Sequence, residues 1–144
     1  MLLVHGTCVV VAGRGVLIRG TSGSGKSDLA LRLIDAGARL VADDQVEIEQ
    51  EDDRLLASPP SPIAGLLEVR GLGIVSLDHQ APVPLALVVD LVKGEEIERM
   101  PADETVELAG RQLRRLALDP REASAVAKVR LAIRTLSGGI LSTK

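Results

Sequence analysis

The stretch from Gly20 to Ser27 constrains the fold of this chain more than any other. It reads Gly-Thr-Ser-Gly-Ser-Gly-Lys-Ser and fits the phosphate-binding pattern G-x-x-x-x-G-K-[ST] at every fixed position. Glycines let the backbone curl until several N–H groups point at phosphate oxygens, and the helix that follows such a loop adds the positive end of its dipole. The predicted nucleotide-binding residues are Gly20, Thr21, Ser22, Gly23, Ser24, Gly25, Lys26 and Ser27.

Two residues of this loop carry its specific chemistry, and the flanks support the motif. Lys26 is expected to reach the β- and γ-phosphates of ATP, and the Ser27 hydroxyl is expected to hold Mg²⁺. Residues 15–18 are typical of a buried strand, and residues 27–36 of a helix that stops at Gly37. The apolar face of that helix comprises Leu29, Ala30, Leu33 and Ile34. A strand, a phosphate loop and a helix in this order predict a P-loop domain.

Length and composition favour a single domain over residues 1–144. With 46% apolar residues the chain can form a substantial core, and no apolar run approaches the ~20 residues of a membrane span. The first residues carry no basic segment of the kind that opens a signal peptide. The single cysteine, Cys8, is expected to be a buried apolar residue, so a reducing, cytoplasmic setting fits.

Charge and aromatic content bear on the partners. The net charge is −3 with both signs mixed along the chain, whereas a nucleic-acid partner requires a basic face. The chain has no Phe, Tyr or Trp, so it cannot stack single-stranded bases on aromatic side chains. The base of a bound nucleotide must rest on aliphatic side chains or arginine, and we expect ATP and GTP to be discriminated less than about a hundredfold.

Two apolar strands are predicted to end in aspartate residues. Residues 39–42 run into Asp43 and Asp44, and residues 85–89 run into Asp90. A carboxylate at the end of a strand beside a phosphate loop is suited to face Mg²⁺ or its water shell. Adjacent carboxylates point in different directions, so one of the Asp43–Asp44 pair can face a metal while the other acts as a base. These residues alone leave open which strand end serves the site, and whether Asp43 and Asp44 form only a solvated turn.

Most of the remaining chain is expected to form short paired strands. These strands are placed at residues 2–11, 46–49, 55–57, 105–108 and 113–118, with a rigid connector without helix at 58–62. A second helix is expected after Asp119-Pro120, ending near Ser137-Gly138-Gly139, with an apolar stripe through Val129 and Ile133. The predicted class is α/β, with a mixed sheet and few helices instead of a regular βαβ series.

Four segments together resemble one known family. They are His5-Gly6, the phosphate loop, residues 39–44, and the run Glu68, Val69, Arg70, Gly71, Leu72, Gly73 and Ile74. Over residues 5–100 this order resembles the catalytic, C-terminal domain of bacterial HPr kinase/phosphorylase, and the last run resembles that family's signature. The resemblance implies a compact P-loop domain of the HPr kinase and phosphoenolpyruvate carboxykinase type. It also implies ATP-dependent phosphorylation of a serine on HPr, the phosphocarrier protein of a phosphotransferase system.

The resemblance also implies roles for individual residues. Lys26 would contact the phosphates, while Ser27 and Glu68 would serve Mg²⁺. Asp44 would be the general base that takes the serine proton, and His5 would belong to the active site. Arg99 would stand where the family has an arginine that helps catalysis. Under this reading Asp90 is structural and Asp43 is a companion that positions metal or base.

The chain departs from the family pattern in two places. It begins almost at His5, as a short form lacking the family's N-terminal domain would, and it has no clear copy of a Pro-Gly-Arg-Asn loop linked to phosphorolysis. Residues 118–122 stand near the expected position of that loop. We therefore expect a kinase with reduced or no phosphorylase activity, working as a homo-oligomer like the family's hexamer, with no nucleic-acid or membrane partner. The alternatives are a P-loop small-molecule kinase and a non-catalytic ATP-sensing module.

Overall fold

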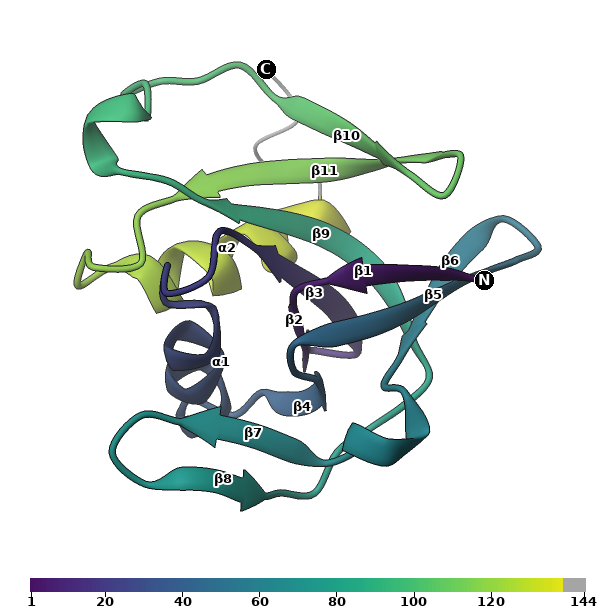
Figure 1. Cartoon of the computed structure of the whole chain (residues 1–144). Helices are drawn as coiled ribbons and strands as arrows, with labels where there is room; N and C mark the ends of the chain where they lie inside the picture. The colour runs from purple at the N-terminus through teal and green to yellow at the C-terminus, as the bar shows by residue number, and fades with distance from the viewer. Residues whose placement is uncertain (139–144) are drawn as a thin grey trace.

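The computed structural model describes residues 1–138 as a curled mixed sheet with two α-helices (Figure 1). The strands are β1 (Leu2–His5), β2 (Thr7–Val11), β3 (Arg14–Arg19), β4 (Arg39–Ala42), β5 (Gln45–Glu51), β6 (Arg54–Ser58), β7 (Leu66–Val69), β8 (Gly73–Ser76), β9 (Val83–Leu91), β10 (Glu104–Leu108) and β11 (Arg111–Leu118). The helices are α1 (Lys26–Asp35) and α2 (Ala125–Gly138), and two short 3₁₀ turns are η1 (Ser61–Ile63) and η2 (Gly94–Glu96). The predicted mixed α/β class is confirmed.

Nine strands form the main sheet, and β9 is its branching element. The strand order is β1-β5-β6-β9-β3-β2-β4, with β11 also paired to β9 and β10 paired to β11. The start of β9 pairs antiparallel with β6, while its later residues pair parallel with β3 on one side and with β11 on the other. Strands β7 and β8 form a separate hairpin beside this sheet.

Strand direction brings the chemistry-bearing loops to one edge. Strands β9 and β11 run parallel to β3, and β2 runs antiparallel to both β3 and β4. Strand β4 therefore points the same way as β3, and β2 starts where those two strands end. In open α/β sheets ligands bind outside the carboxyl ends of the strands. The phosphate loop after β3, Asp43 after β4 and Thr7 at the start of β2 consequently lie at the same edge.

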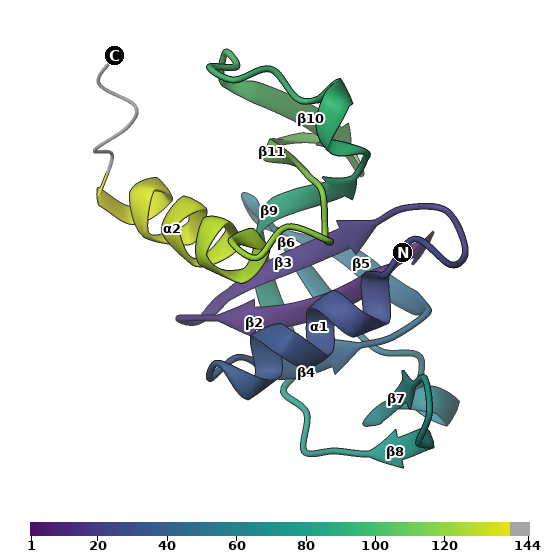
Figure 2. The ribbon, with the colours of Figure 1, turned by 90° about the vertical axis from the view of Figure 1, so that its left-hand side faces the viewer.

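Both faces of the sheet are buried at its centre, which explains the continuous apolar runs of β2 and β3. Along β2, Cys8 packs into one core cluster and Val9 into the other, as the alternation of side chains in a strand requires. Helices α1 and α2 lie side by side over one face, where Leu29 and Ile133 are buried (Figure 2). Cys8 is fully buried, and burial raises the pKa of its thiol to about 12. The prediction of a buried cysteine is confirmed.

The prediction of one strand over residues 2–11 is wrong, because Gly6 divides it. Strand β1 pairs with β5, whereas β2 pairs with β3. A Cβ on Gly6 would lie 2.8 Å from the Ile18 carbonyl oxygen, and the Gly6 N–H donates to the Asp44 carbonyl at 3.1 Å. This close approach holds the β1–β2 junction against the corner between β4 and β5.

Two further expectations about local structure need correction. The second helix begins at Ala125 and not directly after Asp119-Pro120, because the Asp119 carboxylate accepts the N–H groups of Gly94 and Arg121 and so closes a turn. The connector at 58–62 was expected to contain no helix, yet η1 starts within it at Ser61. Gly139, part of the predicted end of the second helix, lies outside the described residues. None of the described helices is long and apolar enough to cross a membrane.

Candidate functional site

The phosphate-binding motif forms the loop between β3 and α1, as the sequence predicted. Gly25 precedes α1 with a φ of 104°, a left-handed conformation that favours glycine. Gly20 is closely packed, because a Cβ there would displace the Ser24 hydroxyl and lie 3.3 Å from the Leu91 Cβ. The Lys26 ammonium donates to the carbonyls of Gly20 and Thr21 at 2.9 and 3.0 Å, which keeps this cation inside the loop.

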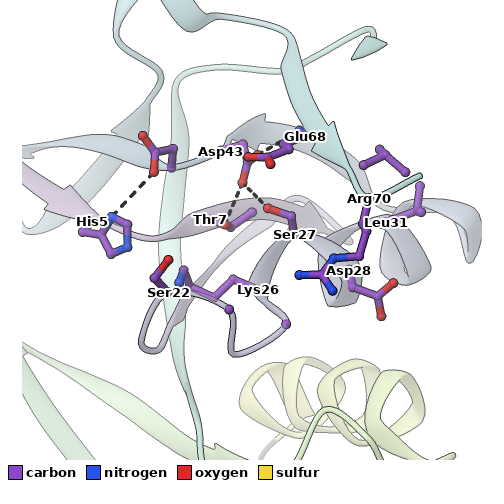
Figure 3. Close-up of a pocket in the computed structure, with 14 residues that line it drawn as sticks. His5, Thr7, Ser22, Lys26, Ser27, Asp28, Leu31, Asp43, Glu68 and Arg70 are labelled. Atoms are coloured by element: carbon purple, nitrogen blue, oxygen red, sulfur yellow. Dashed lines mark hydrogen bonds and ion pairs between the residues drawn. The ribbon is translucent and has the colours of Figure 1, made fainter. Parts of the chain in front are cut away.

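A pocket of about 580 Å³ opens between this loop, the end of β4 and the β7–β8 hairpin (Figure 3). It is lined by His5, Thr7, Ser22, Gly23, Gly25, Lys26, Ser27, Asp28, Leu31, Asp43, Asp44, Glu68, Val69 and Arg70. The structure thus brings together the phosphate loop, both aspartates that follow β4, His5, and the start of the predicted signature run. Its volume falls in the usual range for small-molecule sites.

Asp43 is the inward-facing carboxylate of this pocket. One of its oxygens accepts the hydroxyls of Thr7 at 2.9 Å and Ser27 at 2.8 Å, and the other accepts the Glu68 N–H at 3.1 Å (Figure 3). Its side chain is almost fully buried. All three donors are neutral groups, so the Asp43 carboxylate is held in place without an ammonium or guanidinium partner among the described residues.

Thr7 is a site residue that sequence reasoning missed. It opens the apolar run Thr7–Val11, where a threonine is an ordinary strand residue. It is fully buried, and its hydroxyl reaches Asp43 because β2 starts at the edge where β4 ends. The one available signal was a polar residue directly after His5-Gly6, at the beginning of an otherwise apolar strand.

Asp44 points away from Asp43, toward His5. Its carboxylate lies 3.7 Å from the His5 Nδ1, and both side chains are exposed, at 71% for Asp44 and 57% for His5. Asp44 has a φ of 74°, a left-handed conformation that is uncommon for a residue other than glycine. This turn sends the two neighbouring carboxylates in different directions, one toward Ser27 and one toward the open mouth of the pocket.

The predicted signature run forms the β7–β8 hairpin. Leu67 and Val69 pack inward, while Glu68 lines the pocket from the exposed side of β7. Glu68 lies in β7, which ends at Val69, whereas Arg70 lies in the turn. Both side chains nevertheless line the pocket. Gly71, with a φ of 92°, makes the turn possible.

Asp90, which precedes the last residue of β9, is neutralised by arginines outside the pocket. Its carboxylate accepts two hydrogen bonds from Arg19, at 2.8 and 3.0 Å, and one from Arg115 at 2.6 Å. Partial burial alone would raise its pKa, but the hydrogen bonds and charges of the two arginines outweigh burial and hold the pKa below its usual range. Arg115 also pairs with Glu104 at 2.6 Å. These contacts tie β3, β9, β10 and β11 together.

Arg99 and residues 118–122 lie apart from the pocket lining. Arg99 is exposed in the segment after η2, and the structure does not bring it to the pocket. Pro120 packs beside the phosphate loop, with its Cγ 3.5 Å from where a Cβ on Gly25 would stand. Asp119 directly precedes Pro120. The guanidinium and the backbone N–H of Arg121 hydrogen-bond the Asp119 carboxyl and hold its pKa well below its usual range.

The residues around Ser27 suit a magnesium ion bound together with nucleotide phosphates. Mg²⁺ usually takes one or two protein carboxylates and leaves its other positions to phosphates and water. Ser27 and Asp43 offer a hydroxyl and a carboxylate in contact, and within residues 1–138 no group of three or more His, Cys, Asp or Glu forms a metal cage. The Ser24 hydroxyl is buried in the loop with no hydrogen-bond partner among those residues, which leaves it for a phosphate oxygen.

Sequence comparison shows that this chain is similar to HPr kinases. The family model described as HPr Serine kinase C-terminal domain matches residues 1–136. A relative named HPr kinase/phosphorylase from Geobacillus thermodenitrificans is 53% identical over 96 residues, which cover 61% of this chain and 31% of that relative. A relative of the same name from Bacillus mycoides is 59% identical over 75 residues, which cover 51% of this chain and 24% of that relative. The matches thus span only about a quarter to a third of these curated relatives.

Structural comparison extends over nearly the whole chain. A solved structure described as the Hpr(Ser) kinase/phosphatase from Coxiella burnetii matches with a TM-score of 0.82 and 26% sequence identity. The match covers 97% of this chain and 99% of that chain. The fold built around the phosphate loop is therefore shared with that protein over nearly its whole length.

Proposed function

The chain belongs to the HPr serine kinase C-terminal domain family, and from this premise we propose that it transfers the γ-phosphoryl group of ATP to a serine of an HPr-type phosphocarrier protein. One observation carries the proposal beyond family membership. The carboxylate of Asp43 accepts a hydrogen bond from the Ser27 hydroxyl at the phosphate loop. The carboxylate of Asp44 is exposed at the mouth of the same pocket. A kinase needs a carboxylate beside the nucleotide phosphates and a second carboxylate that can take the proton of the acceptor hydroxyl.

The loop and its neighbours bind and orient the nucleotide in this proposal. Lys26 and the loop N–H groups hold the phosphates, and Ser24 donates to one of their oxygens. Ser27, Asp43 and Glu68 would hold Mg²⁺, which when bound supplies positive charge that offsets the charge of the triphosphate. Thr7 keeps the Asp43 carboxylate turned toward Ser27, so Thr7 is a positioning residue.

Asp44 acts on the acceptor. The serine oxygen forms a bond to the γ-phosphorus as the bond between that phosphorus and the departing ADP oxygen breaks, and Asp44 accepts the serine proton. His5, 3.7 Å from Asp44, orients that carboxylate. The products are phosphoserine, ADP and a proton on Asp44. We assign no contact with the reacting atoms to Arg99, which is exposed outside the pocket.

A protein acceptor fits the pocket rim better than a metabolite does. Leu72 and Ile74, at the tip of the β7–β8 hairpin that walls the pocket, are 78% and 70% exposed. Exposed apolar side chains beside a site favour contact with another protein. A small-molecule kinase would instead need polar groups that enclose the acceptor, and a pure ATP sensor would have no use for the outward carboxylate of Asp44.

The direction of the reaction is a separate part of the proposal. The named relatives are called kinase/phosphorylase and kinase/phosphatase. We propose that this chain favours the kinase direction, because residues 118–122 lack the Pro-Gly-Arg-Asn pattern and Arg121 is held by Asp119. We further propose that residues 1–144 act as one kinase domain within a cytoplasmic homo-oligomer.

The test is transfer of labelled phosphate. The chain is incubated with ATP labelled in the γ-phosphoryl group, Mg²⁺ and purified HPr, and the label is located by mass spectrometry. Label on an HPr serine supports the proposal, and HPr with that serine changed to alanine should remain unlabelled. ATP binding without any transfer would favour the sensing alternative, and transfer only to small metabolites would favour the small-molecule kinase. Incubation of phosphoserine-HPr with inorganic phosphate measures the reverse direction.

A further inference from the structure

A second cavity lies at the far end of α1 from the phosphate loop. It has a volume of about 260 Å³ and opens between the β2–β3 turn, the end of α1 and one face of α2. It is lined by Val11, Ala12, Leu33, Ala36, Gly37, Ala38, Arg130, Ile133 and Arg134. In Figure 2 the two helices that border it lie side by side in front of the sheet. None of its lining residues belongs to the nucleotide pocket.

The lining combines an apolar floor with charge of a single sign. Seven of its residues are apolar or glycine, and Leu33 and Ile133 are buried in the core beneath it. The other two are arginines, Arg130 and Arg134, one helical turn apart on α2 and therefore on the same face. Two guanidinium groups above an apolar floor suit an oxyanion that carries an aliphatic portion.

The side chains of these two arginines form no hydrogen bond with the described residues. Within the side chains described for residues 1–136, neither Arg130 nor Arg134 forms an ion pair, whereas Lys128 on the same helix pairs with Glu122. They are not needed to cap α1 either. The carbonyls of Arg32, Leu33 and Ile34 already accept backbone N–H groups from residues 36–38. Asp35, in the last turn of α1, is not part of the lining.

We propose that this cleft binds a small organic anion, a carboxylate or phosphate ester with a short aliphatic part. Arg130 and Arg134 hold the oxyanion, and the half-buried side chains of Val11 and Ala38 contact the aliphatic part. Helix α1 spans about 15 Å at 1.5 Å per residue, so the anion lies one helix length from the nucleotide phosphates. This site shares no residue with the nucleotide pocket, so its test does not depend on the proposed kinase activity.

The experiment is an amide NMR titration of the full chain with hexanoate, an aliphatic carboxylate. We expect saturable shifts at residues 11–12, 36–38 and 130–134. Arg130→Gln and Arg134→Gln should each weaken hexanoate binding about fivefold, the effect of losing about 1 kcal/mol of charge-assisted hydrogen bonding. Arg54→Gln, the same charge change at the exposed start of β6, should leave binding unchanged.

Three controls keep the result specific. Lys26→Ala should retain hexanoate binding, because the nucleotide loop is a different site, and 1-hexanol should bind more weakly because it lacks the anion. Shifts that do not saturate, shifts confined to the phosphate loop, or equal binding of hexanol would overturn the proposal. So would Arg130→Gln changing the oligomeric mass while leaving hexanoate binding intact, because the cleft would then be a contact between copies.

Discussion

Strand β4 runs into Asp43 and Asp44, strand β9 carries Asp90 next to its last residue, and the structure treats these charges in opposite ways. Among the described residues, Asp43 accepts only neutral donors, and Asp44 has one partner within ion-pair distance, the exposed His5. Asp90 instead lies against two guanidinium groups. Both strands end at the same edge of the sheet, so position along the fold does not distinguish them.

The difference lies in how much charge remains for a ligand. A carboxylate paired with two fixed arginines is already neutralised, and its contacts stabilise the junction of β3, β9 and β11. A carboxylate held by hydroxyl and amide donors keeps its negative charge for a cation or a proton. We therefore assign the catalytic and metal-binding roles to Asp43 and Asp44 at the β4 end, and a stabilising role to Asp90 at the β9 end.

The largest expected effect is on turnover at the β4 end. Asp44→Asn should lower the rate of phosphoryl transfer by roughly 10²–10⁴, the usual contribution of a general base, while ATP affinity changes little. The exposed side chain predicts almost no change in the free energy of unfolding. Rapid-quench kinetics and equilibrium nucleotide binding on the same samples measure both quantities. Unchanged turnover would remove Asp44 from the role of base.

The next effect is on binding at the loop. Lys26→Ala should weaken the binding of ATP by roughly 2–3 kcal/mol, or about 30- to 150-fold, because charge-assisted hydrogen bonds to the phosphates are lost. Calorimetric titration with a non-hydrolysable ATP analogue is the measurement. A variant that binds as tightly as the wild type would show that Lys26 stays with the carbonyls of Gly20 and Thr21 when the nucleotide is present.

At the β9 end the expected loss is in stability. Asp90→Asn should lower the free energy of unfolding by about 1–2 kcal/mol, because Arg19 and Arg115 lose their shared acceptor charge. Denaturant unfolding measures this loss, with Asp53→Asn on an exposed turn as the matched control. Turnover of Asp90→Asn well below its unfolding midpoint should stay within about twofold of wild type. A large fall in turnover with stability unchanged would reverse the two assignments.

The smallest effect is the pH dependence of that stability. The folded pKa of Asp90 lies below the ordinary value of 3.8, so its ionised form stabilises the fold at pH values above 3.8. That contribution falls away as the pH drops through the folded pKa. Wild type should therefore lose more stability than Asp90→Asn between about pH 5 and pH 2. Parallel acid unfolding curves for the two proteins would contradict a depressed pKa at Asp90.

The sequence predicted the elements that local patterns determine. The phosphate loop has fixed spacing, and its flanking strand and helix follow from hydrophobic periodicity, so β3 and α1 appear where expected. The opposite directions of Asp43 and Asp44 also followed from their adjacency after a strand. These features depend on residues close together in the chain.

Features that depend on distant contacts were missed or misplaced. Gly6 breaks the first strand because of the Ile18 and Asp44 carbonyls, and Thr7 joins the site through Asp43, 36 residues away. The Arg19–Asp90 pair spans 71 residues. Propensity in a short window contains no information about such partners.

The most direct measurement compares the two strand ends in one assay. Asp44→Asn and Asp90→Asn remove the same charge from aspartates at the same edge of the sheet, so their single-turnover rates of γ-phosphoryl transfer to an HPr serine can be compared directly. We predict a rate for Asp44→Asn that is roughly 10²–10⁴ below wild type, and a rate for Asp90→Asn within about twofold of wild type. Equal rates for the two variants, or a slower Asp90→Asn that is still fully folded, would contradict the assignment of chemistry to the end of β4.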